Sequence, residues 1–260
     1  MTRLAFAGDR QVAVECLAVL LDVGVHPEAI MISSPDRATH ADILVKMSGL
    51  DSDRVLIGTE FRQAPGIALL RSLDLAYVVG VHFPYIVPEE VLEIPQVGVL
   101  NLHPSLLPYN RGWHTPSWAI LDGTPAGATL HFMARGVDTG DIVAQIELEV
   151  RPEDTAHTLY SRLLDLEVKL FRDAWPLLAS GRPPRIPQSP DSGTSHNRSD
   201  LSSDSVRRLD LESMVPVKDV LRTIRALTTN DVEEAAYFET GGRRYRVQVT
   251  IVPDELPTAP

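Results

Sequence analysis

The chain has 260 residues, of which 44% are hydrophobic and 23% charged, and its formal net charge is -11. This composition is typical of a folded globular protein with one large core and excludes a disordered chain. The acidic balance argues against a protein that mainly grips a nucleic-acid backbone. No apolar run reaches the roughly 18 residues that a membrane span needs.

The N-terminal sequence MTRLAFAGDR carries charges at Asp9 and Arg10, which end its apolar stretch too early for a signal peptide. The single cysteine, Cys16, has no partner for an intramolecular disulfide. We therefore expect a cytoplasmic protein in which Cys16 is a buried structural thiol.

Short apolar runs alternate with helical patterns over the first 100 residues. Pro65 fits the first turn of a helix that ends near Arg71. Another helix is expected over residues 11–23, and strands over residues 3–7, 29–33, 54–57, 75–79 and 97–101. Strands that alternate with helices predict an α/β fold with a Rossmann-like, mostly parallel sheet and helices on both faces.

The turn after the first strand reads AGDRQV and has one glycine, Gly8. It lacks the G-x-G-x-x-G run that lets a pyrophosphate approach the backbone, and there is no phosphate loop with a Lys-Ser/Thr pair. We therefore expect neither NAD nor ATP at this turn.

The middle of the chain predicts one short and one long helix. Thr115 is expected to cap the short one, with Pro116 as its first residue and Gly123 at its end. Strands are expected over residues 129–133 and 142–150. A long helix with a steady apolar stripe follows over residues 155–179, and Gly181 closes it.

Composition changes after the long helix. Residues 181–198 are rich in proline and serine and indicate a connection, which divides the chain into units 1–185 and 186–260. The second unit predicts a helix over 217–227 and a β-hairpin around Gly241 and Gly242. Because so few residues hold little core, we expect this extension to pack on the main unit or on a second subunit of a homodimer.

Polar residues of catalytic type gather between residues 101 and 141. Asn101 and His103 are expected just past the end of a central strand, where open parallel sheets bind ligands. Asp138 follows in the Gly- and Thr-rich turn GVDTGD. Together they offer an oxyanion donor, a proton acceptor and an orienting carboxylate. Each also has a structural interpretation, because Asn and Asp often stabilise turns, and His131 in a strand is expected to be a core histidine.

The blocks NLHPSLLPYNRG and HFMARGVDTGDI resemble the hallmark of the 10-formyltetrahydrofolate-dependent formyltransferases in order and spacing. That family includes enzymes acting on methionyl-tRNA, glycinamide ribonucleotide and nucleotide sugars. The resemblance implies that Asn101, His103 and Asp138 are catalytic, with 10-formyltetrahydrofolate as co-substrate and no metal. Asn101 would stabilise the developing oxyanion, His103 would accept or relay the amine proton, and Asp138 would orient His103 or a water.

The resemblance also suggests where the folate binds. The expected loop is FPYIVP, and its alternative interpretation is a hydrophobic lead into a helix at 88–92. The family further places a cis peptide at the position of Leu107–Pro108. The residues expected to contact the folate are Phe83, Pro84, Tyr85, Ile86, Val87, Gly136 and Asp141.

The amine acceptor favoured by the sequence is a nucleotide sugar, for example dTDP-4-amino-4,6-dideoxyglucose. Residues 191–260 hold nine Arg/Lys and twelve Asp/Glu, a balance of -3 that fits tRNA poorly. The stretch YNRGWHTPSWAI looks most like the sugar enzymes. The expected substrate contacts are Asn110, Arg111, Trp113 and His114, with Arg222 and Arg225 for the diphosphate and Tyr237 and Tyr245 for the base.

Other interpretations stay open at this point. The arginines suit a solvated helix face, and the tyrosines suit the core of a hairpin. The acceptor could instead be methionyl-tRNA, glycinamide ribonucleotide or water, or the chain could be a silent binding module. The sequence leaves open the sugar configuration, the position of the amine, the base, the group that takes the first proton, and the oligomeric state.

Overall fold

The computed structural model describes residues 2–189 and 191–254. Its strands are β1 (Leu4–Gly8), β2 (Ala29–Ile32), β3 (Val55–Ile57), β4 (Tyr77–Val81), β5 (Gly98–His103), β6 (Arg111–Gly112), β7 (Ala126–Phe132), β8 (Ile142–Leu148), β9 (Ser195–His196), β10 (Ala236–Thr240) and β11 (Arg243–Val247). Its helices are α1 (Arg10–Asp22), α2 (Ala41–Ser48), α3 (Ala64–Ser72), α4 (Glu89–Leu92), α5 (Thr115–Asp122), α6 (Ala156–Ala179), α7 (Asp204–Arg207) and α8 (Val217–Ala226).

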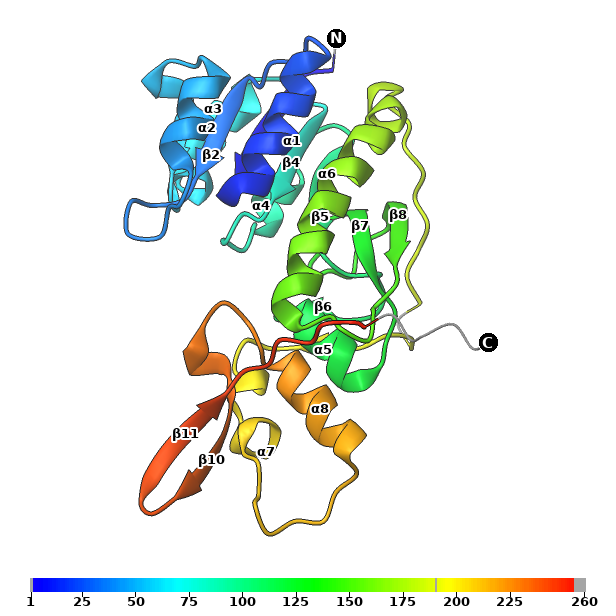
Figure 1. Ribbon diagram of the computed structural model, residues 1–260. Coiled ribbons are helices and arrows are strands. Elements are labelled where there is room, and N and C mark those ends of the chain that lie inside the picture. The colour runs from blue at the N-terminus through cyan, green and yellow to red at the C-terminus, as the bar shows by residue number, and fades with distance from the viewer. Residues whose placement is uncertain (1, 190, 255–260) are drawn as a thin grey trace.

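The main unit is a seven-stranded sheet in the order β3-β2-β1-β4-β5-β7-β8 (Figure 1). Strands β1 to β5 run parallel, while β7 is antiparallel to both of its neighbours. One core cluster joins the sheet to α1, α2 and α6, and a second joins the opposite face to α3 and α4. The predicted α/β fold, with helices on both faces, is confirmed. Cys16 lies buried in the first cluster, as expected.

Strand β5 is longer than its apolar run predicted. It continues to His103 because it is hydrogen-bonded on both sides, with Val81 opposite Leu102 and Thr129 opposite His103. The expectation that Asn101 and His103 lie past the strand is therefore wrong: both are inside it. Their side chains start from rigid sheet backbone, which positions them more precisely than a loop does.

Helix α5 begins one residue earlier than predicted. His114, with φ of 57°, is the N-cap, and Thr115 is already helical. The Thr115 hydroxyl donates a 2.6 Å hydrogen bond to the Pro104 carbonyl instead of capping the helix. Gly123 ends the helix in the left-handed conformation, as predicted.

The proline-rich connection packs against the main unit. Ile186 exchanges backbone hydrogen bonds with Ile142 at the edge of β8. Further along, β9 pairs in parallel with β6, which places Ser195 opposite Arg111 and His196 opposite Gly112. This segment therefore lies directly beside the loop that follows β5.

The C-terminal extension packs on the main unit, as expected. Helix α8 lies against α5, and a small core joins Trp118 of α5 to Leu201, Leu227 and Ala236. The predicted hairpin is present as β10 and β11, but β11 stops at Val247. After Val247 the chain passes the C-terminal end of α8, where the Val249 N–H donates to the Thr228 hydroxyl.

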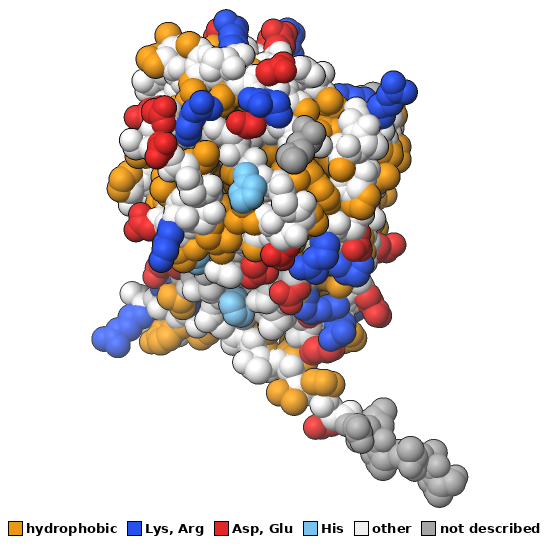
Figure 2. Space-filling model, turned by 90° about the horizontal axis from the view of Figure 1, so that it is seen from above, with side chains coloured by type: hydrophobic (Ala, Val, Ile, Leu, Met, Phe, Trp, Pro, Cys, Tyr) orange, Lys and Arg blue, Asp and Glu red, His pale blue; other side chains and the backbone are white. Residues whose placement is uncertain are grey.

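Charged side chains of both signs are scattered over the face of the molecule shown in Figure 2. On the face in Figure 2, Lys and Arg side chains are interspersed with Asp and Glu. In the part of the chain that the structure describes, no helix is long and apolar enough to cross a membrane.

Candidate functional site

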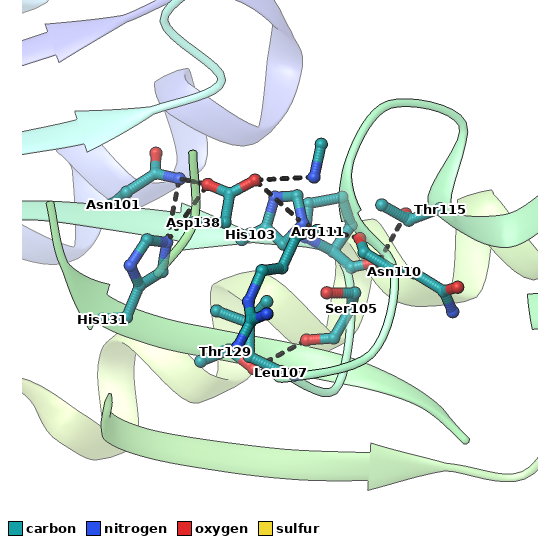
Figure 3. A network of polar contacts seen from close by, with 12 residues as sticks. Asn101, His103, Ser105, Leu107, Asn110, Arg111, Thr115, Thr129, His131 and Asp138 are labelled. Atoms are coloured by element: carbon teal, nitrogen blue, oxygen red, sulfur yellow. Dashed lines mark hydrogen bonds and ion pairs between the residues drawn. The ribbon is translucent and has the colours of Figure 1, made fainter. Parts of the chain in front are cut away.

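The carboxylate of Asp138 is the centre of a polar cluster at the C-terminal end of β5 (Figure 3). Asn101 Nδ2 donates to Asp138 Oδ1 at 3.4 Å, and His103 Nε2 lies 3.5 Å from Asp138 Oδ2. The backbone N–H of Gly112 donates to Oδ2 at 2.9 Å. The three residues that the sequence singled out thus meet in space, although 37 positions separate Asn101 from Asp138.

The tautomer of His103 follows from its neighbours. Its Nε2 lies 3.3 Å from the Asn110 carbonyl as well as near Asp138, and both groups only accept hydrogen bonds. Nε2 must therefore carry a hydrogen, which leaves the lone pair of a neutral ring on Nδ1. This is the arrangement of a base oriented by a carboxylate.

His131 belongs to the same cluster. It stands opposite Asn101 in the β5–β7 register, is almost fully buried, and lies 3.2 Å from Asn101 Nδ2 and 3.5 Å from Asp138 Oδ1 through its Nε2. Its Nδ1 donates to the Phe132 carbonyl at 2.8 Å. The sequence predicted a core histidine at this position. Only the antiparallel pairing of β5 with β7 shows that His131 lies beside Asn101.

The cluster keeps Asp138 ionised. Burial alone would raise its pKa, but His103, His131 and the N–H of Gly112 outweigh burial and hold the pKa of this carboxyl well below its usual range. The backbone of Asp138 is left-handed, with φ of 52°, as is that of Asn110 at 55°. Non-glycine residues adopt this conformation at an energetic cost, and such strain is concentrated at functional sites.

Two residues expected to contact the sugar serve the loop itself. The Asn110 side chain is fully buried, donating to the Thr124 hydroxyl at 2.8 Å and accepting from the Thr194 hydroxyl at 3.1 Å. The Arg111 guanidinium is nearly buried and donates twice to Gln188 Oε1, at 2.8 and 3.1 Å. They anchor Gln188 and Thr194 to the catalytic loop, so neither presents a free polar group to a ligand.

Trp113 and His114, the next two expected contacts, do face open space. Trp113 is 47% exposed, and the Arg198 guanidinium lies 5.3 Å from its ring centroid. His114 lines a hollow of about 710 Å³. Burial lowers the pKa of His114, and the charges of Arg198 and Arg207 lower it further against the opposing influence of Glu234.

The C-terminal candidates are placed differently. Arg222 and Arg225 line a separate hollow of about 510 Å³ at the C-terminal end of α5. Tyr237 is buried, and its hydroxyl donates to Asp204. This position agrees with the alternative interpretation, in which the tyrosine belongs to the core of the hairpin. Tyr245 stacks on Phe238 with ring centroids 5.3 Å apart and stays partly exposed. The structure does not bring these four residues to the Asp138 cluster.

The expected folate loop follows β4. Phe83 and Tyr85 pack inward on Phe61, with ring centroids 5.3 and 6.3 Å from it, and the Tyr85 hydroxyl accepts from Ser34 N–H. These contacts hold the loop, and Ile86 points outward with 79% of its surface exposed. The other FPYIVP positions are Pro84, which is exposed, and Val87, which is partly buried.

The turn that carries Asp138 is fixed from both ends. Its last residue, Asp141, accepts a backbone hydrogen bond from Phe132 and lies 3.8 Å from Arg185. A Cβ on Gly136 would stand 2.5 Å from the Thr139 hydroxyl, so the close approach there requires glycine. The peptide bond between Leu107 and Pro108 is cis, as expected.

Comparison with known proteins identifies relatives of both parts of the chain. The formyl transferase family model matches residues 54–175, and the model of the N-formyltransferase dimerization C-terminal domain matches residues 203–253. A dTDP-4-amino-4,6-dideoxyglucose formyltransferase of Mycobacterium bovis is 31% identical over 164 residues, covering 62% of this chain and 68% of the relative. A methionyl-tRNA formyltransferase of Pelotomaculum thermopropionicum is 32% identical over 194 residues, covering 72% of this chain. The chain spans only 61% of that relative's length.

Solved structures extend the likeness to the whole chain. A sugar N-formyltransferase from a Shewanella species has the same fold, with a TM-score of 0.81 at 22% identity, over 98% of this chain and 100% of that one. A formyltransferase of Anoxybacillus kamchatkensis, solved with UDP-4,6-dideoxy-4-formamido-L-AltNAc and tetrahydrofolate, is 28% identical with a TM-score of 0.51, over 67% of this chain and 88% of that one. With its fold, its polar cluster and its relatives in agreement, the chain belongs to the formyl transferase family.

Proposed function

We propose that the protein transfers a formyl group from 10-formyltetrahydrofolate to the amine of a nucleotide-linked amino sugar. The observation that carries the proposal is the Asp138 carboxylate, held against both Asn101 and His103 at the end of β5. An amide donor, a base with a defined tautomer and an orienting carboxylate are the groups that acyl transfer to an amine requires.

In the proposed reaction, the amine nitrogen bonds to the formyl carbon while the bond from that carbon to the folate nitrogen breaks. Asn101 Nδ2 donates to the formyl oxygen as negative charge grows on it, a role worth about 3–4 kcal/mol of barrier. The hydrogen bond from Asn101 Nδ2 to Asp138 Oδ1 is long, at 3.4 Å. This hydrogen can therefore turn from Asp138 to the formyl oxygen as negative charge builds on that oxygen.

His103 moves the proton. Its Nδ1 lone pair accepts the hydrogen that the attacking amine loses and returns it to the departing folate nitrogen, so the reaction consumes no net proton. Asp138, ionised because of its lowered pKa, stabilises the imidazolium in between and fixes the ring through Nε2. This assigns the first proton to His103, which the sequence left open.

Features beside the cluster support the folate as formyl donor. Ile86 in the loop after β4 and Val137 next to Asp138 expose 79% and 59% of their surfaces. Two large exposed apolar side chains, one in the loop after β4 and one in the Asp138 turn, suit a flat aromatic ligand that would cover them. We assign the pterin to these two side chains, with backbone groups of Pro84, Val87 and the Gly136–Asp141 turn as its polar partners. The Anoxybacillus relative was solved with tetrahydrofolate.

Three observations support a sugar as acceptor. The Mycobacterium bovis relative acts on dTDP-4-amino-4,6-dideoxyglucose, which we propose as the substrate type here. The C-terminal unit matches an N-formyltransferase domain. Its acidic balance, with twelve Asp/Glu against nine Arg/Lys over residues 191–260, disfavours a tRNA backbone. Methionyl-tRNA is the second candidate, because of the Pelotomaculum relative. We place the reaction in the cytoplasm and the catalysis in residues 1–185.

The test is a mass-spectrometric assay. The protein is incubated with 10-formyltetrahydrofolate and, separately, with dTDP- and UDP-linked 3-amino and 4-amino sugars and with methionyl-tRNA. A gain of one formyl group on a sugar, absent with Asn101→Ala, supports the proposal and names the substrate. Formylation of methionyl-tRNA alone would replace the acceptor. Release of free formate without any amine would make the protein a deformylase.

A further inference from the structure

A carboxylate lies in the apolar interior on α6. Glu167 is fully buried, on the same stripe of the helix as Leu163 and Phe171, which are four residues away on either side and buried too. The neighbouring residues of α6 belong to the core cluster that joins this helix to the sheet. A buried charge lowers stability unless it is paired, so a carboxylate in this place indicates a specific partner.

The partner is His82. Its Nε2 lies 2.8 Å from Glu167 Oε2, and the side chain of His82 is only 9% exposed. The other carboxylate oxygen, Oε1, has no hydrogen-bond partner among the residues that the structure describes. His82 is therefore the group that compensates the buried carboxylate, and the position of Glu167 fixes the position of the imidazole.

His82 is also the residue at which the chain leaves the sheet. It follows Val81, the last residue of β4, and its backbone is left-handed, with φ of 51°. Its side chain packs toward α6, whereas the rings of Phe83 and Tyr85 pack on Phe61 in the core cluster on the opposite face of the sheet. The loop after β4 is thus tied to both faces, and His82 is its attachment at the entry.

A second contact to α6 holds the other side of the imidazole. The Tyr160 hydroxyl lies 3.4 Å from His82 Nδ1, and it accepts a 2.8 Å hydrogen bond from the Arg10 guanidinium. Tyr160 and Glu167 are seven residues apart, so they project from the same face of α6. Both ring nitrogens of His82 therefore face one helix.

Side-chain contacts are what hold the loop of residues 83–87. None of its backbone groups is hydrogen-bonded to another backbone group in the part of the chain that the structure describes. Such a segment has few constraints of its own, and its N–H and C=O groups stay free for a ligand. The shape in which the loop presents these groups depends on its side-chain anchors.

The His82 contacts lie where the order of the strands reverses. β1 and β4 are neighbours in the sheet, β2 and β3 lie beyond β1, and β5 lies beyond β4. Ligands of such sheets bind beyond the carboxyl ends of the strands at this point. On β4, Gly80 stands opposite Asn101, so His82 is two residues beyond the register position of the catalytic amide. A displacement of His82 would therefore move the start of the loop beside the catalytic strand.

We propose that His82, held by the buried carboxylate of Glu167, is a positioning residue for the folate, which fixes the loop after β4 in the shape that receives the pterin. This role rests on the proposed function for its ligand. His82 is assigned no contact with the reacting atoms, so its loss should weaken folate binding and leave the chemical step nearly unchanged.

The test compares two variants of His82 by calorimetric titration of the full-length protein with tetrahydrofolate. In His82→Gln the amide nitrogen can take the place of Nε2 and donate to Glu167, whereas the shorter side chain of His82→Asn does not reach it. His82→Asn should weaken the Kd at least about 10-fold, and His82→Gln no more than about threefold. Because asparagine tolerates a left-handed backbone better than glutamine, backbone strain alone predicts the opposite order.

Controls separate this role from folding. His26→Asn, at an exposed loop position before β2, should leave the Kd within about twofold. In the transfer assay, His82→Asn should raise KM for 10-formyltetrahydrofolate at least about 10-fold and change kcat and the KM for the amino sugar less than about twofold. Circular dichroism checks that each variant is folded. The double variant His82→Asn with Glu167→Gln leaves no unpaired buried charge, and it should show the same weak binding.

The proposal is overturned if folded His82→Asn and the double variant bind tetrahydrofolate as tightly as the wild type, because the ion pair then serves stability alone. Equal losses in His82→Asn and His82→Gln also overturn it, since the contact with Glu167 would not matter. A wild-type protein that binds no tetrahydrofolate would refute both this role and the proposed function. The proposed function fails separately if tetrahydrofolate binding depends on His82 but no amine is formylated, which would refute the reaction and keep the positioning role.

Discussion

The Asn101 amide group shows how the residues of the site depend on one another. Its Nδ2 has two hydrogens, and in the structure these face His131 Nε2 and Asp138 Oδ1. His131 Nε2 lies 3.2 Å from this amide nitrogen and 3.5 Å from Asp138 Oδ1, and the ring is held by its Nδ1 contact with the Phe132 carbonyl, so the buried ring packs against both groups. The donor is then fixed before a substrate arrives, which is the condition for strong oxyanion stabilisation.

Asn101→Ala should reduce kcat about 100-fold or more, because it removes the only side-chain donor that we assign to the oxyanion. Single-turnover kinetics with 10-formyltetrahydrofolate and the sugar substrate measure the effect. Asn230→Ala, at an exposed loop position, is the matched control and should retain full activity. Turnover near the wild-type value in Asn101→Ala would remove Asn101 from the mechanism.

The ionised Asp138 predicts a pH-dependent stability. Its folded pKa is lowered, so its contribution is fully present above the unfolded pKa of about 3.9 and is lost as pH falls through that value toward the folded pKa. Wild type should therefore exceed Asp138→Asn in free energy of unfolding at pH 7 and 5, with a smaller difference at pH 3. Urea denaturation at the three pH values checks this, and a constant difference would contradict it.

The role of a residue could be predicted from the sequence where a motif indicates that role. It could not be predicted where the role depends on partners that only the fold brings close. Asn101, His103 and Asp138 were found by their types and their family resemblance. Asn110 and Arg111 belong to the same motif, yet their side chains are directed inward to Thr124, Thr194 and Gln188. Those partners lie up to 84 residues away, and no local pattern indicates them.

Among the elements, those with a clear period were predicted well and the short ones were not. The long helix α6 has its predicted Thr155 cap, whereas β6 and β9 have two residues each and show no periodicity. Their pairing depends instead on a close approach at Gly193, where a Cβ would stand 2.0 Å from the Pro108 carbonyl. Composition alone therefore indicated a linker where the fold places a segment that pairs with the loop after β5.

Gly193→Ala should detach this segment from the loop after β5. Gly193 has φ of 89° and Gly181 has φ of 71°, but a Cβ on Gly181 would meet nothing within 4 Å. Alanine at a left-handed position costs about 1 kcal/mol, so Gly181→Ala should lose that amount and Gly193→Ala clearly more. The Gly193 variant should also lower turnover, because the segment that follows Gly193 pairs with Gly112, whose N–H contacts Asp138. Equal unfolding free energies in urea for the two variants would contradict the clash.

At the scale of the whole molecule, the C-terminal unit has two apolar sides. Through α8 and Trp118 it packs on α5, and this side buries Leu227 and Ala236. The other side leaves Met214 fully exposed, together with Val217 and Leu221, which are one helical turn apart on α8. Exposed apolar side chains that gather in this way mark interaction sites. The family model that matches residues 203–253 describes a dimerization domain.

We therefore expect a homodimer that uses the exposed apolar side of residues 211–221. Met214→Asp should shift the protein toward a monomer, because a buried, unpaired carboxylate destabilises an interface. Light scattering after gel filtration, at micromolar concentration, gives the mass. Val23→Asp, at the exposed end of α1, places the same charge on an apolar surface residue outside the C-terminal unit and should leave the dimer intact. A Met214→Asp protein that remains dimeric would move the interface to another surface, and a monomeric wild type would show that the exposed side serves another partner.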